Sequence, residues 1–169
     1  MDSVRLTIRK AHPADAPAIH NILAVSFSEY HTLLGIRPKA LTESIEDIVK
    51  EIKNKTVLVA VVNNMLLCGT LRYEFAGDVC YISRFGVLPN WQAAGAGGEL
   101  LAFVEQACSE AGTKAMCLHT ATKLFKQTRY YYGQGFFIHS TTHDRGYVRG
   151  LFVKELSSDP YDLSGVINL

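Results

Sequence analysis

The chain has 169 residues, 48% hydrophobic and 20% charged, which excludes intrinsic disorder and predicts a single globular domain over residues 1–169. Lys and Arg number 17 against 16 Asp and Glu, a formal charge of +1, so no charge excess predicts a nucleic-acid or membrane surface. Widely spaced cysteines predict neither a metal site nor a disulfide scaffold. Because no segment reads as a membrane span or a leader peptide, we expect a cytoplasmic protein.

The N-terminal third predicts a strand followed by two helices. Apolar residues alternate over residues 4–9, as in a half-buried strand, and helical spacing begins near Ala14. Residues 28–42 lack a clear period and contain Gly35 and Pro38, so we expect a loop with at most one irregular turn. Thr42 can cap a second helix, whose apolar stripe runs from Ile45 to Ile52.

The remainder predicts mostly strands. Residues 55–62 and 65–75 form a hairpin around Asn63 and Asn64. The elements expected after it are a strand over 79–88, a loop over 89–98, a helix over 100–108, a strand over 115–118, a helix over 122–132, and strands over 136–139 and 147–153. This order predicts a mixed α/β fold that alternates less regularly than a doubly wound one.

Residues 85–101, FGVLPNWQAAGAGGELL, carry the strongest functional signal. Pro89 ends a strand, and alanine and glycine fill positions 93–98 before a helix. The first N–H groups of a helix lack partners within it and attract anions, and small side chains let a phosphate approach them. A close helix–strand packing turn needs the same small residues, so local sequence alone leaves both interpretations open.

Two common phosphate motifs are disfavoured in this segment. A dinucleotide fingerprint requires G-x-G-x-x-G, but Leu100 stands at its third glycine position. A Walker loop requires Lys and then Ser or Thr after its last glycine, whereas Glu99 and Leu100 stand there.

The segment resembles the acyl-CoA loop of the GNAT superfamily of N-acetyltransferases. That loop reads V-x-P and then Q/R-x-x-G-x-G/A, and residues 87–89 and 92–97 match it. The family's Y-x-x-x-G-F motif matches residues 131–136, YYGQGF. The opening IRKAHPADAPAI and the order of predicted elements also match, so the resemblance covers nearly the whole chain.

The resemblance implies a fold and a co-substrate. The fold is α/β of the α+β type, with a mixed, mostly antiparallel sheet of about seven strands flanked by about four helices. The co-substrate is acetyl-CoA, with its pantetheine arm along the fourth strand and its pyrophosphate on the loop. The cofactor-binding residues implied are Phe85, Gly86, Val87, Gln92, Ala93, Ala94, Gly95, Ala96, Gly97, Gly98, Leu124, Phe125 and Lys126.

The implied activity is acetyl transfer to a primary amine by direct attack in a ternary complex. The N–H of Val87 polarises the thioester carbonyl, and Tyr131 protonates the departing CoA thiolate. Neighbouring tyrosines on a helix point about 100° apart, and the motif selects Tyr131 rather than Tyr130 or Tyr132. Many family members have Asn where this chain has Leu124, which puts one cofactor contact in doubt.

An alkylammonium acceptor must lose a proton before it attacks. Family members often use a Glu on the fourth strand, but the central part of this strand has no carboxylate. The candidates are His119, Glu74 and a water chain. We predict His119 as the catalytic base because an imidazole is neutral at working pH, although a lone strand histidine is more often structural.

The acceptor is predicted only as a class. The loop over 28–42 and the last hairpin, where specificity is expected, carry both charges, and a small-molecule amine is favoured. An acidic group could attract a polyamine, but a solvated helix surface explains it better. The acidic group comprises Glu43, Glu46, Asp47 and Glu51. By analogy, an exposed last strand could pair in a homodimer.

Two alternatives need no catalysis. A sensor that binds acyl-CoA requires residues 87–98 but not Tyr131, and an interaction module that only inherits the fold requires neither. Gly95 and Gly97 in the loop, and Tyr131 in register, favour an enzyme.

Overall fold

The computed structural model describes residues 3–169, which divide into two compact units. Unit 1 contains the described residues up to Tyr73 together with residues 84–104, and unit 2 contains residues 74–83 and 105–169. Three elements run from one unit into the other: β3 (Leu66–Ala76), β4 (Val79–Val87) and α5 (Ala96–Ala111).

Seven strands are hydrogen-bonded in the order β1-β2-β3-β4-β5-β7-β6. The other five are β1 (Leu6–Lys10), β2 (Thr56–Val62), β5 (Ala115–Ala121), β6 (Phe137–Thr142) and β7 (Arg149–Glu155). β4 and β5 are parallel, whereas the β1–β2, β2–β3, β5–β7 and β6–β7 pairs are antiparallel. The predicted mixed, mostly antiparallel α/β sheet is confirmed.

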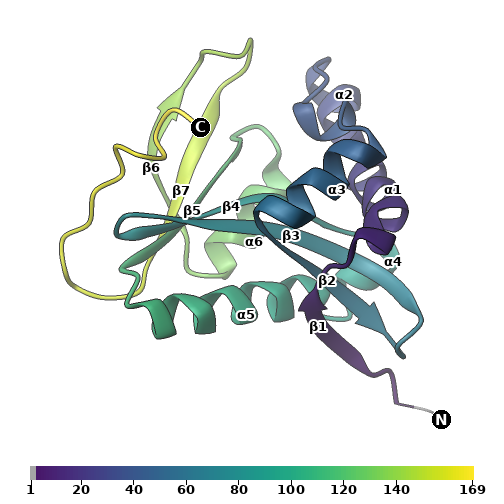
Figure 1. Ribbon diagram of the computed structural model, residues 1–169. Coiled ribbons are helices and arrows are strands. Elements are labelled where there is room, and N and C mark those ends of the chain that lie inside the picture. Colours follow the sequence, from purple (N-terminus) through teal and green to yellow (C-terminus); the bar gives the residue numbers. More distant parts are fainter. Residues whose placement is uncertain (1–2) are drawn as a thin grey trace. The chain divides into compact units, whose positions relative to one another are not determined.

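Unit 1 is built on β2 and the helices α1 (Ala16–Ser26) and α3 (Ile45–Asn54), which contact each other (Figure 1). Every second residue of β2 packs with the apolar stripe of both helices, because alternate side chains of a strand share one face. The fully buried side chains include Ile19, Leu23 and Ile48. The apolar period therefore explains both the helices and their packing.

Unit 2 has its own core between β4, β5 and β7 and the segment that follows β7. Val79, Cys117 and Val153 are fully buried there, and Leu163 and Val166 of the C-terminal segment pack against them. Helix α6 (Phe125–Gly133) lies between β5 and β6 in the chain. Within residues 3–169, no helix combines the length and the apolar character that crossing a bilayer requires.

The predicted loop over residues 28–42 is wrong in its first half. Residues 28–34 form helix α2 (Ser28–Leu34), which ends at Gly35 with φ 66°, and a 3-10 turn, η2 (Lys39–Leu41), follows. Tyr30 is buried and stacks on Phe27 with ring centroids 5.7 Å apart. A helix held by one aromatic anchor shows no apolar period, which explains the error.

Two predicted helix starts are also wrong. α3 is capped by Ser44 rather than Thr42: the Ser44 hydroxyl accepts the Asp47 N–H at 3.1 Å, and the Asp47 carboxylate accepts the Ser44 N–H at 3.0 Å. This reciprocal capping box satisfies two donors at once. α5 begins at Ala96 rather than Leu100, and residues of the predicted loop form the short helix α4 (Pro89–Gln92).

The homodimer expectation assumed an exposed last strand, but β7 does not lie at an edge of the sheet. β7 pairs with β5 along one side and with β6 along the other. The edge strand at this end of the sheet is therefore β6.

Candidate active site

The small-residue segment of unit 1 forms the turn between α4 and the start of α5. Residues 92–95 are exposed, and Gly95 has φ 84°. The Glu99 N–H donates to the Gly95 carbonyl at 3.0 Å, which is the first turn of the helix. Within a helix, the N–H groups of the opening residues have no acceptor. A Cβ added at Gly95 or Gly98 meets no atom within 4 Å, so the segment leaves room for an anion beside these donors.

The end of β4 presents the backbone of Val87 along one edge. The Leu88 N–H donates to the Cys68 carbonyl of β3 at 2.8 Å. Successive backbone groups of a strand point to opposite sides, so the N–H and C=O of Val87 point away from β3. The Gln92 side chain donates to that carbonyl at 3.2 Å. Gln92 thus ties the turn to the end of β4.

Gly86 is required by close packing within unit 1. A Cβ at this position lies 2.6 Å from the Ser26 hydroxyl oxygen at the end of α1. A side chain here forces α1 and β4 apart, which explains a glycine in a strand. Phe85, the preceding residue, is half-buried and Val87 is buried.

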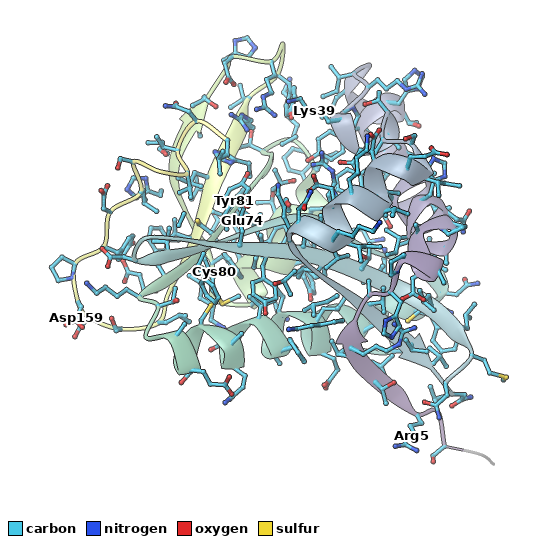
Figure 2. All side chains as sticks on the ribbon, in the orientation of Figure 1. Arg5, Lys39, Glu74, Cys80, Tyr81 and Asp159 are labelled. Atoms are coloured by element: carbon cyan, nitrogen blue, oxygen red, sulfur yellow. The ribbon has the colours of Figure 1, made fainter. Side chains whose placement is uncertain are left out.

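In unit 2, His119 of β5 is hydrogen-bonded to Tyr81 of β4. Its Nδ1 lies 2.8 Å from the Tyr81 hydroxyl, and the two rings are tilted, with centroids 5.7 Å apart. Figure 2 labels Tyr81 and Glu74, the other candidate base, which is half-buried on β3. Burial, followed by the positive charge of Arg149, lowers the pKa of His119 to about 4. The imidazole is therefore neutral across the physiological pH range.

Tyr131 is the buried member of the three consecutive tyrosines of α6. It is 7% exposed, whereas Tyr132 is 51% exposed. Its ring centroid lies 5.7 Å from those of Phe136 and Phe152. Burial raises the pKa of the half-buried Tyr130. The aromatic neighbours fix the Tyr131 ring in one orientation.

The predicted contacts at the start of α6 divide into a core residue and two exposed ones. Leu124, the residue before the helix, is 1% exposed, and its side chain belongs to the core. Phe125 is 77% exposed and Lys126 is also exposed. Only the latter two side chains are accessible to a ligand.

The structure adds residues that the sequence analysis missed. Tyr81 is one of these, because the sequence predicts it only as a member of a strand without a carboxylate. The solvated-surface interpretation is wrong for Glu43, whose carboxylate is bound by Arg72 and Arg84, while Glu46 is exposed as expected. No sequence signal links Glu43 to arginines 29 and 41 positions away.

The chain matches one protein-family model, described as the acetyltransferase (GNAT) family, over residues 17–136. No curated protein matches the sequence.

Solved structures share the fold at low sequence identity. The PaiA N-acetyltransferase of Thermoplasma acidophilum, in complex with coenzyme A, is 18% identical with a TM-score of 0.76, covering 89% of this chain and 99% of its own. YncA of Salmonella typhimurium, with acetyl-CoA, is 19% identical with a TM-score of 0.71, covering 94% and 98%. The ribosomal-protein-S18-alanine N-acetyltransferase of Escherichia coli is 16% identical with a TM-score of 0.72, covering 94% and 99%.

Proposed function

Because the chain belongs to the acetyltransferase (GNAT) family, we propose that it is an acetyl-CoA-dependent N-acetyltransferase whose acceptor is the primary amine of a small molecule. The observation that carries the choice of acetyl-CoA is the turn before α5, which is exposed over residues 92–95 and has open space around Gly95 and Gly98. The complexes of PaiA with coenzyme A and of YncA with acetyl-CoA support it. The coverage of 99% of the PaiA chain supports treating residues 1–169 as one acetyltransferase domain.

The residues of the turn fit a pyrophosphate. The N–H groups that open α5 are unpaired within the helix and lie at the positive end of its dipole. α5 has 16 residues, long enough for a full terminal partial charge. The N–H groups of Ala94 and Gly95 donate within the turn, at 3.3 and 3.4 Å, so the N–H groups of residues 96–98 are the pyrophosphate donors in this proposal. The family resemblance adds the side chains of Phe125 and Lys126, which are exposed.

The acetyl thioester supplies an electrophilic carbonyl whose oxygen gains negative charge as the amine attacks. The N–H of Val87, directed away from β3, donates to that oxygen, and a fixed donor stabilises the transition state more than the ground state. The hydrogen bond from Gln92 to the Val87 carbonyl holds this peptide in place.

His119 takes the proton that the amine releases during attack. Its pKa of about 4 keeps the imidazole unprotonated throughout the physiological range, but it also makes the imidazole a weak base, because the most effective catalytic base has a pKa near the operating pH. The Nε2 atom of the ring is buried. The Tyr81 hydrogen bond at Nδ1 fixes the orientation of the ring. Tyr131 gives a proton to the CoA sulfur, so the leaving group departs as a neutral thiol.

The test is acetyl transfer to a panel of amines, followed by release of free thiol and by the mass of the acetylated product. Tyr131→Phe keeps the aromatic packing and removes only the hydroxyl, so we expect kcat to fall about 100-fold or more. Tyr132→Phe, at the exposed neighbour, is the matched control and stays near wild type. Acetyl-CoA binding without thiol release from any amine identifies a sensor instead, and equal rates for the two variants remove Tyr131 from the mechanism.

A further inference from the structure

One residue of β4 has a backbone conformation that its side chain disfavours. Arg84 has φ 51°, and the other non-glycine residues with positive φ among residues 3–169 are Asn63 and Asn64 of the β2–β3 turn. Asparagine tolerates the left-handed region, whereas a long side chain within a strand is an outlier there. Such strain persists only where the surroundings enforce it, and it concentrates at functional positions.

Arg84 lies just beyond the part of β4 that pairs with β5. The pairing of β4 with β5 runs from Val79 to Ile82, and the division between the two units falls between Ser83 and Arg84. A left-handed residue in a strand redirects the backbone that follows, as in a β-bulge. The backbone that follows is residues 85–87, the segment assigned above to the acetyl thioester.

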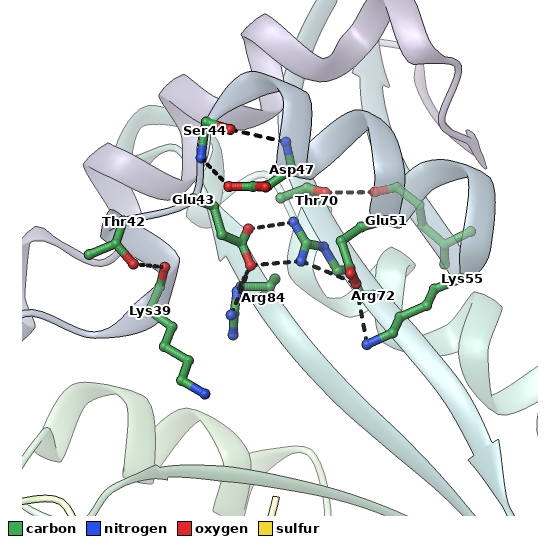
Figure 3. A network of polar contacts seen from close by, with 11 residues as sticks. Lys39, Thr42, Glu43, Ser44, Asp47, Glu51, Lys55, Thr70, Arg72 and Arg84 are labelled. Atoms are coloured by element: carbon green, nitrogen blue, oxygen red, sulfur yellow. Dashed lines mark hydrogen bonds and ion pairs between the residues drawn. The ribbon is translucent and has the colours of Figure 1, made fainter.

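Glu43 anchors the Arg84 side chain. Its carboxylate accepts two hydrogen bonds from Arg72, at 3.0 and 2.7 Å, and one from Nε of Arg84 at 2.9 Å (Figure 3). Arg72 of β3 is 3% exposed and also lies 3.7 Å from Glu51 of α3. A bidentate arginine pair fixes the carboxylate in position and in plane, so Arg84 is bound to a rigid partner.

The same contacts exclude Glu43 as a catalytic base. Burial raises its pKa, but the hydrogen bonds and charges of Arg72 and Arg84 outweigh that effect and lower the pKa below its usual value. Its oxygens are occupied by two guanidinium groups. The carboxylate can therefore act on the reaction only through Arg84.

We propose that Glu43 is a positioning residue: held by Arg72, it keeps Arg84 in the left-handed conformation and thereby directs the N–H of Val87 toward the thioester oxygen. This inference rests on the proposed function. When the anchor is lost, Arg84 relaxes toward an extended φ and the donor at Val87 loses its direction. The turn before α5 is untouched, so the effect falls on the chemical step rather than on the binding of acetyl-CoA.

The experiment compares wild type, Glu43→Gln and the double variant Glu43→Gln/Arg84→Gly. We expect kcat of Glu43→Gln to fall roughly 10- to 100-fold, the factor that corresponds to backbone strain of this size. We expect KM for acetyl-CoA to change by less than about threefold. Glycine adopts positive φ without steric cost, so the double variant regains about tenfold in kcat. Glu46→Gln, at an exposed acid in the first turn of α3, keeps wild-type kcat.

A readout independent of turnover is the sign of φ at residue 84, measured in solution from the amide-to-α-proton coupling and the nuclear Overhauser effect. We expect positive φ in wild type and in the double variant, and an extended backbone in Glu43→Gln. Circular dichroism and thermal unfolding confirm that each variant is folded at the assay temperature.

The possible results distinguish a failure of the positioning role of Glu43 from a failure of the proposed function. Wild-type kcat in a folded Glu43→Gln overturns the inference, as does positive φ at residue 84 in a Glu43→Gln enzyme that has lost activity. A double variant no faster than Glu43→Gln also overturns it, because relief of strain then has no effect. A wild-type protein that transfers acetyl to no amine overturns the proposed function, whereas the φ measurement still decides whether Glu43 holds Arg84.

Discussion

Glu43 and His119 are both partly buried, and they end in opposite charge states. In unit 1, Glu43 remains ionised because Arg72 and Arg84 bind its carboxylate. In unit 2, His119 remains neutral because burial and the positive charge of Arg149 both oppose a further proton. Burial alone disfavours the charged form of both groups. The sign of the neighbouring charges decides which group stays ionised, and so which serves as an anchor and which as a proton acceptor.

Glu43→Gln has the largest expected effect, because it removes the charge at the centre of the arginine contacts. The substitution removes the negative charge that pairs with Arg72, which is 3% exposed, and leaves the ion pair with Glu51 at 3.7 Å. Removing one partner of a buried ion pair costs about 3 kcal/mol, which lowers Tm by roughly 6–12 °C for a chain of this size. Thermal unfolding measures it, with Glu46→Gln as the exposed control. An equal Tm for both variants means that water already solvates Arg72 and Arg84.

The pH dependence of stability tests the His119 half of the comparison. The pKa of His119 is about 4 in the folded protein, against 6.5 for the free side chain. Between these values the unfolded chain binds more protons, so stability is lost as pH falls from about 6.5 to 4. Because the imidazole is only partly buried, solvent screening reduces the loss to about 1–2 kcal/mol.

Urea unfolding at pH 7.5 and pH 5 gives the size of this loss. We expect His119→Gln to lose less stability than wild type between these pH values, and His20→Gln, at an exposed residue of α1, to behave as wild type. Glu43 adds a further loss only below about pH 4.5, since its pKa is lowered from that value. Identical pH slopes for wild type and His119→Gln contradict a neutral, partly buried His119.

The Ser44 cap of α3, a polar contact at the surface, gives a reference effect on Tm for the partly buried groups Glu43 and His119. Ser44→Ala removes the hydroxyl that accepts the Asp47 N–H at the start of α3. The loss of a helix cap costs about 1 kcal/mol, or about 2–4 °C in Tm. Thr42→Ala, at the residue first expected as the cap, changes Tm by less. A larger loss of Tm in Thr42→Ala than in Ser44→Ala places the cap at Thr42.

Local patterns in the sequence predict the elements whose packing is local. The alternation in β2 and the stripe of α3 specify their buried faces, and the GNAT motifs identify the turn before α5 and the position of Tyr131. α2 is missed because one buried aromatic residue, Tyr30, holds it rather than a periodic face.

The polar partners of the candidate site could not be predicted in the same way. Tyr81 and His119 are 38 positions apart, and Glu43 and Arg84 are 41 apart. Only the strand register and the chain path bring such residues together. The left-handed φ of Arg84 has no local signal either, because arginine is not a residue that favours it.

Thermal unfolding with acetyl-CoA, for wild type, Gly98→Ala and Gly98→Glu, tests directly whether the turn before α5 binds this co-substrate. A Cβ at Gly98 meets no atom within 4 Å, and an acid in the first turn of a helix is favourable, so both variants fold. The glutamate places a negative charge beside the proposed pyrophosphate site. At about 100 times Kd, acetyl-CoA raises Tm of wild type by roughly 5–11 °C. We expect most of that shift in Gly98→Ala, little in Gly98→Glu, and none with ATP or NAD. No shift in wild type, or an equal shift in Gly98→Glu, contradicts the binding of acetyl-CoA at this turn.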